Sequence, residues 1–301
     1  MSCHGRYTLS CSTGTLALAR PGAQYYDLRT ALECARELGL SDLELLLHPE
    51  WRPEHPPRTP STADWASVPK LDAHQVRALV LEAAREGLTF PSVHANRDIG
   101  KLLCSRDLSN RREALQELMR ACLLATELGA TVVVVHAWDT YAPILPLEDI
   151  AAALRQIMAE LPPVPVLSLE NIPTSERCRT PAQTLRALLE MLPAERVGVT
   201  VDLTWASLCD NLPDLLELTP RVNNVHIHAK IVRPRQPSPG FLLRPYHGHL
   251  DLMESIRQLA AAGYRGLWTL ELRGARCGSD FTEALARLHH LLQDATSCAS
   301  P

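Results

Sequence analysis

Four residues that commonly bind divalent metals stand at the ends of short apolar runs in the second half of the chain: Glu170, Asp202, His228 and Glu271. Ionised carboxylates are rarely buried unless they are paired or bound to a cation, because their desolvation costs several kcal/mol. If the fold brings these side chains together, they predict a site for one divalent metal ion. Three carboxylates and one imidazole suit Mn²⁺ best, with Mg²⁺, Co²⁺ or Zn²⁺ as alternatives. For each residue alone, a salt bridge with an arginine is the competing interpretation.

Two further histidines, His94 and His136, close apolar runs earlier in the chain. We expect both to contact the substrate or to bind an additional metal ion, and the alternative for each is a structural hydrogen bond. Lys230 lies two residues beyond His228, which places both on the same face of a strand. Its ammonium group is expected to bind a substrate carboxylate, phosphate or hydroxyl, or else to pair with Glu271.

Tryptophans fall in the predicted connections between strands and helices, at Trp51, Trp65, Trp138 and Trp205. Large aromatic side chains in such connections predict walls around a pocket, on which the C–H faces of a sugar or cyclitol ring can stack. Trp138 and Trp205 are therefore expected to bind substrate, although local clusters or a subunit interface would use the same side chains. Arg233 lies in the basic segment VRPRQPSPGFLLRP and is expected either to reach a substrate anion or to stay in solvent.

The chain as a whole alternates eight short apolar runs with longer amphipathic segments. This alternation predicts an α/β fold, a single (β/α)8 TIM barrel, in which the catalytic groups stand at the C-terminal ends of the strands. The predicted strands are 7–11, 42–47, 89–94, 131–136, 164–170, 196–202, 222–228 and 266–272. Period-two alternation predicts the inward-facing pairs Ser92/His94, Ser168/Glu170, Thr200/Asp202, His226/His228 and Thr269/Glu271.

We expect one domain over residues 1–301, with long βα loops at 48–70 and 231–249 and a disordered tail at 295–301. The formal net charge of −4 argues against a nucleic-acid partner. No apolar stretch reaches the ~18 residues of a membrane span, and the N-terminus lacks a signal-peptide pattern, so we expect no membrane partner and a cytoplasmic location. Nine cysteines without a CxxC pair are expected to be reduced. A homo-oligomer is left open, because no exposed stripe identifies an interface.

These residues resemble the xylose isomerase-like TIM barrels of the AP endonuclease family 2 superfamily. That family includes sugar phosphate isomerases and epimerases, hydroxypyruvate isomerase, inosose dehydratase and endonuclease IV. The segment GHLDLMESIRQLAAAGYRGLWTLEL is similar to the family's C-terminal pattern, in which a helix precedes a Tyr-Xaa-Gly and the last glutamate. The resemblance implies that Glu170, Asp202, His228 and Glu271 hold the metal. It also implies that Glu170 and Glu271 are catalytic, one removing and the other returning a proton.

The expected function is a divalent-metal-dependent isomerase or epimerase that acts on a sugar, keto-sugar or related polyol by proton transfer next to a carbonyl. A dehydratase of an inosose or dehydroshikimate-type substrate is the alternative, since it uses the same enolate chemistry with an added general acid. Endonuclease IV-like members carry a histidine where this chain has Trp205, and many relatives carry an acidic residue at the position of Ile231. Both departures argue against a phosphodiesterase. A non-catalytic partner subunit is the remaining alternative.

Overall fold

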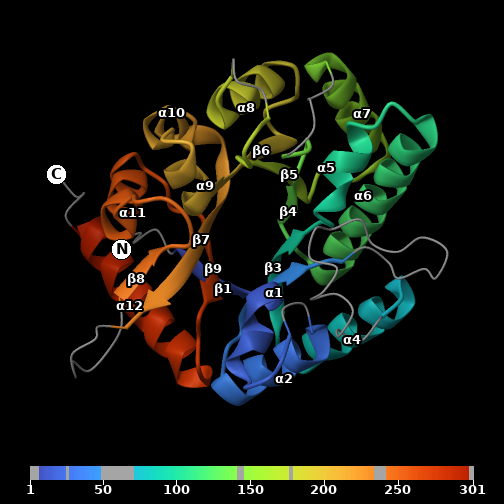
Figure 1. The fold of residues 1–301 in the computed structure, drawn as a ribbon. Coiled ribbons are helices and arrows are strands. Elements are labelled where there is room, and N and C mark those ends of the chain that lie inside the picture. Colours follow the sequence, from blue (N-terminus) through green and yellow to red (C-terminus); the bar gives the residue numbers. More distant parts are fainter. Residues whose placement is uncertain are drawn as a thin grey trace, which may run out of the picture.

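Eight parallel strands close into a barrel in the computed structural model, which describes residues 7–24, 27–48, 71–140, 146–175, 179–233 and 242–297 (Figure 1). Neighbouring strands follow the order of the chain, and β9 closes the barrel between β1 and β7. The fold is therefore the predicted single (β/α)8 barrel. The barrel strands are β1 (Thr8–Ser12), β2 (Asp42–Leu46), β3 (Thr89–His94), β4 (Val132–Val135), β5 (Val166–Glu170), β6 (Val197–Asp202), β7 (Val222–Val232) and β9 (Leu267–Arg273).

Helices surround the barrel and connect successive strands (Figure 1). Their ends follow local chemistry: α2 begins at the side chain of Asp27, which accepts from the backbone of Thr30, and ends at Gly39 in the left-handed region with φ 66°. The helices are α1 (Thr13–Leu16), α2 (Leu28–Leu38), α4 (Ala73–Arg85), α5 (Asp98–Leu103), α6 (Leu108–Leu128), α7 (Leu147–Glu160), α8 (Pro181–Glu190), α9 (Leu203–Leu208), α10 (Leu212–Leu216), α11 (Leu252–Ala261) and α12 (Gly278–Ser297), with short 3-10 turns at Ala17–Ala19 and Thr219–Arg221. None of these described helices is both long and apolar enough to cross a membrane.

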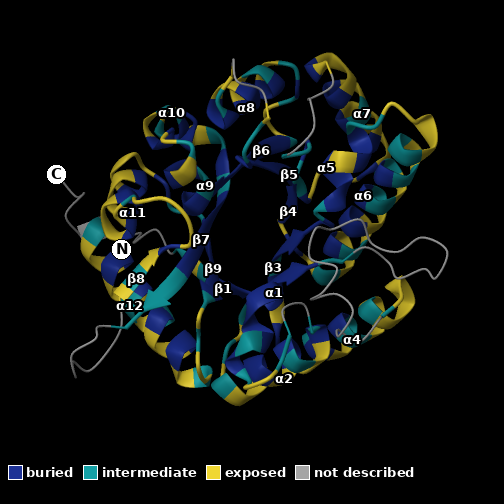
Figure 2. Ribbon diagram, in the orientation of Figure 1, coloured by how far each residue is buried: buried dark blue, intermediate teal, exposed yellow. Residues whose placement is uncertain are grey.

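The strands alternate between an apolar outer face and a polar inner face. Outward residues such as Val93, Leu169 and Ile227 are fully buried in the core between strands and helices (Figure 2). Inward residues hydrogen-bond to one another inside the barrel; for example, the Oγ1 of Thr200 donates to the Oγ of Ser168 at 2.7 Å. The predicted inward register is confirmed by these contacts, and it directs the acidic and imidazole residues at the strand ends into the barrel mouth.

Two sequence predictions are corrected, one about a connection between strands and one about the C-terminal tail. The segment 231–249 is not simply a loop, because β7 continues to Val232 and pairs antiparallel with β8 (Leu242–Pro245). This hairpin projects from the barrel rim beside the site. The tail predicted to be disordered from residue 295 is helical as far as Ser297, in α12, and residues 298–301 lie outside the described residues. Of the predicted 48–70 loop, residues 49–70 also lie outside them, together with Trp51 and Trp65.

Candidate active site

The four predicted metal ligands all lie at the C-terminal ends of neighbouring strands, β5, β6, β7 and β9, and none is more than 5% exposed. The Nδ1 of His228 lies 4.0 Å from the Oδ2 of Asp202 and 3.9 Å from the Oε2 of Glu271. Two ligands that each lie about 2.1 Å from one ion are separated by no more than about 4.2 Å. His228 is therefore within ligand spacing of Asp202 and of Glu271 separately, but among the described residues the three together are not one of the groups whose ligand atoms all lie within 4.8 Å of one another.

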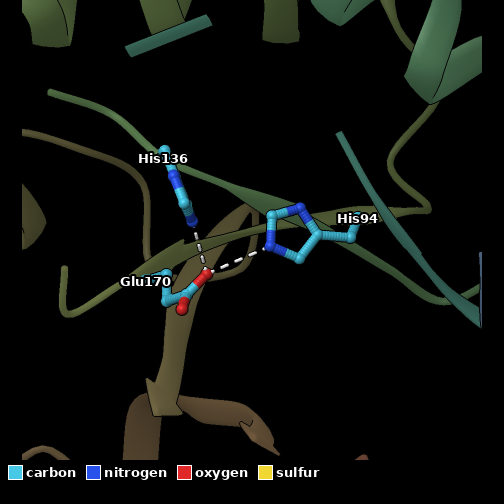
Figure 3. Close-up of side chains that lie close together, drawn as sticks. All are labelled: His94, His136 and Glu170. Carbon is cyan, nitrogen blue, oxygen red and sulfur yellow. Dashed lines mark hydrogen bonds and ion pairs between the residues drawn. The ribbon is translucent and has the colours of Figure 1, made fainter. Parts of the chain in front are cut away.

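Among the described residues with ligand spacing, Glu170 groups with Asp202 and His226 rather than with His228 and Glu271. Its ligand oxygen lies within 4.8 Å of ligand atoms of Asp202 and His226. Two more imidazoles approach its Oε2, with the Nε2 of His136 at 2.8 Å and the Nε2 of His94 at 3.2 Å (Figure 3). Sequence reasoning placed both histidines at the mouth of the site, and the structure places them directly against a predicted ligand.

The surroundings of Glu170 and Glu271 favour the ionised carboxylate. Burial alone would raise the pKa of both groups. At Glu170, His136 and the other hydrogen-bonded histidines outweigh burial and bring the pKa well below its ordinary value. At Glu271, burial is outweighed by the neighbouring imidazoles of His228 and His226, and the pKa falls to about 2. Both glutamates are thus negatively charged at neutral pH.

The negative charges of Glu170 and Glu271 disfavour the ionised form of Asp202. Burial and the charges of Glu170 and Glu271 raise the pKa of Asp202 well above its ordinary value. A divalent cation among the three carboxylates would remove that repulsion. In addition, the Oε1 of Glu271 is buried and has no hydrogen-bond partner among the described residues. The charge of the donor set and this unsatisfied oxygen both fit a divalent metal ion.

His228 has the protonation state that a metal ligand needs. Burial is the main reason that its pKa falls to about 4, so the imidazole is neutral at pH 7. Its ring stacks on Tyr246 at a centroid distance of 4.8 Å and an interplanar angle of 7°. The Nε of Arg273 lies 3.5 Å from Nε2. These contacts fix the ring so that Nδ1 faces Asp202 and Glu271.

The histidine-rich side of the site forms a second group with ligand spacing, made of His94, His136 and Glu170. The Nδ1 of His94 lies 2.8 Å from the carbonyl oxygen of Ala95. Since a carbonyl only accepts hydrogen bonds, the Nδ1 of His94 donates this bond. The ligand atoms of His94, His136 and Glu170 all lie within 4.8 Å of one another. This group could therefore also hold an ion, with Glu170 shared between the two positions.

Asp202 is held rigidly by contacts that its role as a ligand does not require. Its Oδ1 accepts from the backbone N–H of Trp205 at 2.9 Å and so caps helix α9. Its backbone exchanges two hydrogen bonds with the side chain of Asn171, at 2.6 Å and 3.1 Å. Because Asn171 directly follows Glu170, these bonds tie the ends of β5 and β6 together. The other carboxylate oxygen of Asp202 is left facing His228.

The aromatic residues predicted as pocket walls divide into two cases. Trp205 lies at the mouth, where its ring stacks on His247 at a centroid distance of 6.0 Å. Trp138 is 1% exposed and packs in the core, and its indole N–H donates to the carbonyl of Pro173 at 3.1 Å. The prediction that Trp138 forms an open wall is therefore corrected, because its ring surface is covered by the protein.

The two cationic residues predicted to bind substrate are engaged with the protein itself. The Nζ of Lys230 donates to the carbonyl of Tyr246 at 3.3 Å, across the β7–β8 hairpin. Arg233 donates to the Oδ2 of Asp280 at 2.5 Å and to the carbonyl of Gly274 at 3.3 Å. The prediction for Arg233 is corrected: its guanidinium fastens β7 to the start of α12 rather than facing the ligands.

Sequence reasoning missed two residues that contact the site. Glu44 is fully buried inside the barrel on β2, and Tyr246 follows β8 and stacks on His228. The inward alternation used for five other strands also applies to Asp42–Leu46, and it would have placed Glu44 inside the barrel. No comparable signal in the sequence identifies Tyr246, because its position depends on the hairpin.

Comparisons with known proteins agree with this architecture. A family model described as xylose isomerase-like TIM barrel matches residues 32–293. A search of curated proteins found no match. Among solved structures, an L-ribulose 3-epimerase is 17% identical, with 97% of each chain covered and a TM-score of 0.64. A D-allulose 3-epimerase from Methylomonas sp. in complex with D-allulose is 16% identical, with 98% of this chain and 94% of that chain covered and a TM-score of 0.62. A xylose isomerase-like TIM barrel protein from Mycobacterium smegmatis in complex with magnesium is 17% identical, with 100% of both chains covered and a TM-score of 0.60.

Proposed function

Because the chain belongs to the xylose isomerase-like TIM barrel family, we propose that it is a divalent-metal-dependent isomerase or epimerase of a sugar, keto-sugar or related polyol. The observation that carries the proposal is the pair of buried glutamates, Glu170 and Glu271. They come from β5 and β9, which β6 and β7 separate in the barrel, so the two carboxylates approach the mouth from different sides. Solved structures with the same fold include sugar 3-epimerases and a protein in complex with magnesium, which agrees with this choice.

Glu170, Asp202, His228 and Glu271 would hold the metal, with Mn²⁺ as the first candidate. When bound, a divalent ion supplies positive charge that stabilises the negative charge developing on a carbonyl oxygen during proton abstraction. The residues of the chain then have to move one proton. One glutamate removes a proton from the carbon next to the carbonyl, and the other returns a proton to the opposite face of that carbon.

The remaining residues of the mouth bind and orient. His94 and His136 hold the Oε2 of Glu170, and Tyr246 and Trp205 offer aromatic surface on the side of the hairpin. Aromatic rings suit the C–H face of a sugar, which needs an apolar surface next to polar groups. The combination of a polar floor that would hold the metal and an aromatic wall supports the proposed substrate class.

Hydrogen exchange during turnover tests the reaction class. The protein, reconstituted with Mn²⁺, is incubated in D₂O with a panel of ketoses that includes D-allulose and L-ribulose, and the sugars are followed by ¹H NMR. We expect one ketose to incorporate deuterium next to its carbonyl and to convert to an epimer or an isomer. Accumulation of an ultraviolet-absorbing enone would instead identify a dehydratase. Metal binding without exchange of any substrate proton would overturn the proposal in favour of a non-catalytic role.

Metal content tests the ligand assignment independently of substrate. Mass spectrometry of the gently purified protein is expected to give about one divalent ion per chain, with the ion lost in Glu271→Gln and in Asp202→Asn. His136→Ala serves as the matched control, because it removes a histidine of the second group and leaves all four predicted ligands intact. Loss of the ion in His136→Ala but not in Asp202→Asn would move the site to the group of His94, His136 and Glu170.

A further inference from the structure

The barrel interior contains a buried carboxylate that the proposed chemistry does not use. Glu44 on β2 is 0% exposed, and charged side chains are seldom buried without partners. Ser92 and Asn224 each donate to its Oε2 at 2.8 Å. The Nε2 of His226 lies 3.2 Å from each of its two oxygens. Glu44 is therefore the fixed acceptor at the centre of a hydrogen-bond network below the mouth.

His226 links this network to the predicted active site. Its ring is 1% exposed and stacks on His94 at a centroid distance of 5.6 Å and an interplanar angle of 27°. While Nε2 contacts Glu44, Nδ1 on the opposite side of the ring lies 3.7 Å from the Oε1 of Glu170. One imidazole thus spans two carboxylates, one deep in the barrel and one at the mouth.

The contacts of Glu170 divide between its two oxygens. The Oε2 faces His94 and His136, and the Oε1 faces His226. Contacts on both oxygens restrict rotation of the carboxylate about its last bond. Of these three histidines, only His226 is itself anchored by a second buried carboxylate.

We propose that His226, anchored by Glu44, is a positioning residue that fixes the carboxylate plane of Glu170 for proton transfer. The inference rests on the proposed function, in which Glu170 is one of the two groups that move the proton. His226 acts through Glu170 and does not touch the substrate. Misplacement of a reacting group by about 1 Å can cost about 100-fold in rate, so the anchor is expected to act mainly on kcat.

Paired amide substitutions separate the two contacts of the ring. The amide nitrogen of asparagine takes the place of Nδ1, so His226→Asn keeps an N–H facing Glu170. The amide nitrogen of glutamine takes the place of Nε2, so His226→Gln keeps an N–H facing Glu44 only. A positioning role predicts that kcat falls about 10–100-fold in His226→Gln, with KM within about threefold, while His226→Asn recovers most of kcat. If His226 only provides a hydrogen bond to the buried carboxylate of Glu44, kcat should instead fall in His226→Asn and be retained in His226→Gln.

A readout without substrate completes the experiment. The visible absorption of the Co²⁺-loaded protein reports the geometry of the metal ligands, and His226→Gln is expected to shift the bands at unchanged Co²⁺ content. The control is Thr184→Ala, which removes a hydrogen bond of 3.1 Å from a buried side chain of α8 to the carbonyl of Thr180 and touches no hydrogen-bond partner of Glu44 or His226. Its spectrum and kcat are expected to match those of the wild type. Thermal unfolding checks that each variant is folded.

The outcomes distinguish this inference from the proposed function. Loss of Co²⁺ in both His226 variants would make His226 a ligand and overturn the positioning role. Wild-type spectra and wild-type kcat in His226→Gln would overturn it as well. If the wild type converts no sugar at all, the proposed function fails, and a shifted Co²⁺ spectrum in His226→Gln with an unshifted spectrum in His226→Asn would still support the positioning of Glu170.

Discussion

Glu170 and Glu271 occupy equivalent places at the barrel mouth but have different surroundings. Glu170 has imidazole nitrogens against both of its oxygens, at 2.8 Å, 3.2 Å and 3.7 Å. Glu271 has one oxygen 3.9 Å from His228, while its other oxygen is buried with no hydrogen-bond partner in the described part of the chain. Hydrogen bonds to a carboxylate fix its direction and stabilise its charge. The comparison indicates that Glu170 is the more rigid of the two groups and that Glu271 has an oxygen available for a metal ion or a proton.

The largest effect on kcat is expected from removing the negative charge of Glu170 or of Glu271. Glu170→Gln and Glu271→Gln should each lower kcat by about 10²–10⁴-fold, the usual contribution of a general acid or base. Because Glu271→Gln is also expected to weaken metal binding, both variants are assayed in excess Mn²⁺ and their metal content is measured. With the ion restored, each variant should lose deuterium exchange from a different epimer, since each glutamate serves one face of the substrate carbon. NMR in D₂O with the two epimers supplied separately measures this. Loss of exchange from the same epimer in both variants would contradict the two-base arrangement.

A substitution at Gly100, which packs against the backbone of His136, should displace the histidines around Glu170 and leave Glu271 unchanged. Gly100 in α5 packs so closely that a Cβ there would lie 2.2 Å from the carbonyl oxygen of Trp138 and 2.7 Å from that of His136. Gly100→Ala is expected to destabilise the fold by about 1–3 kcal/mol, the usual cost of overpacking, and to displace His136. Urea unfolding measures the first effect and the Co²⁺ spectrum the second.

Gly39→Ala is the control for this prediction. Gly39 has φ 66° and open space around its Cβ position, so the substitution strains the backbone at the end of α2 without crowding another side chain. It should reduce stability and leave the Co²⁺ spectrum unchanged. Equal unfolding free energies for Gly100→Ala and the wild type would show that the close packing of α5 is not needed.

A smaller effect, this time on stability, is expected at Asp202: removal of its charge should stabilise the metal-free protein. Burial and the charges of Glu170 and Glu271 raise the pKa of Asp202, so its ionised form opposes folding of the metal-free protein at neutral pH. Asp202→Asn removes the charge and keeps a side chain that can cap α9. The metal-free variant should therefore be more stable than the metal-free wild type, and about 1 kcal/mol corresponds to roughly 2–4 °C in Tm.

Added Mn²⁺ should reverse that order. The wild type gains stability from the ion because only the folded protein presents the assembled ligands, and Asp202→Asn gains less. Scanning calorimetry with EDTA and then with excess Mn²⁺ measures both differences. A variant less stable than the wild type under both conditions would mean that Asp202 is mainly structural.

The smallest effect is expected at the aromatic wall on the side of Glu271. Tyr246→Ala should raise KM by about 2–10-fold and weaken Mn²⁺ binding by a similar factor, since an aromatic stack such as the one on His228 contributes about 0.5–1.5 kcal/mol. Tyr246→Phe keeps the ring and should keep KM. Steady-state kinetics on the substrate found by exchange measures both variants, and an equal rise in KM would assign the effect to the hydroxyl group instead.

The barrel and the inward direction of the residues at the strand ends could be predicted because they depend on local rules. Period-two alternation places a residue such as Asp202 inside the barrel wherever its strand neighbours are apolar, and parallel strands bring their C-terminal ends to one rim. The same rule also places Glu44 inside the barrel, between the outward-facing Leu43 and Leu45. The burial of Trp138 could not be predicted, because a tryptophan in a connection has the same sequence signal whether it faces a pocket or the core.

The contacts of Arg233 and Lys230 could not be predicted from the local sequence, for a different reason. Arg233 pairs with Asp280, a residue 47 positions away, and only the closure of β7 against the start of α12 brings them together. The hairpin of β7 and β8 likewise depends on pairing between distant segments, so its strand at Leu242–Pro245 was read as loop. Contacts of this kind belong to tertiary structure and leave no periodic trace in the sequence.

The extension of β7 has a consequence for how this barrel could diverge. Inside the barrel the strand is held by β6 and β9, and its pairing with β8 begins at Ala229, the residue directly after His228. One continuous strand therefore presents His228 from inside the barrel and forms part of the rim beyond Ala229. Mutations along the outer pairs, such as Val232 with Leu242, can reshape the rim while the inner part of the strand keeps its register. New substrate preferences could arise in this hairpin without moving the proposed metal ligand His228.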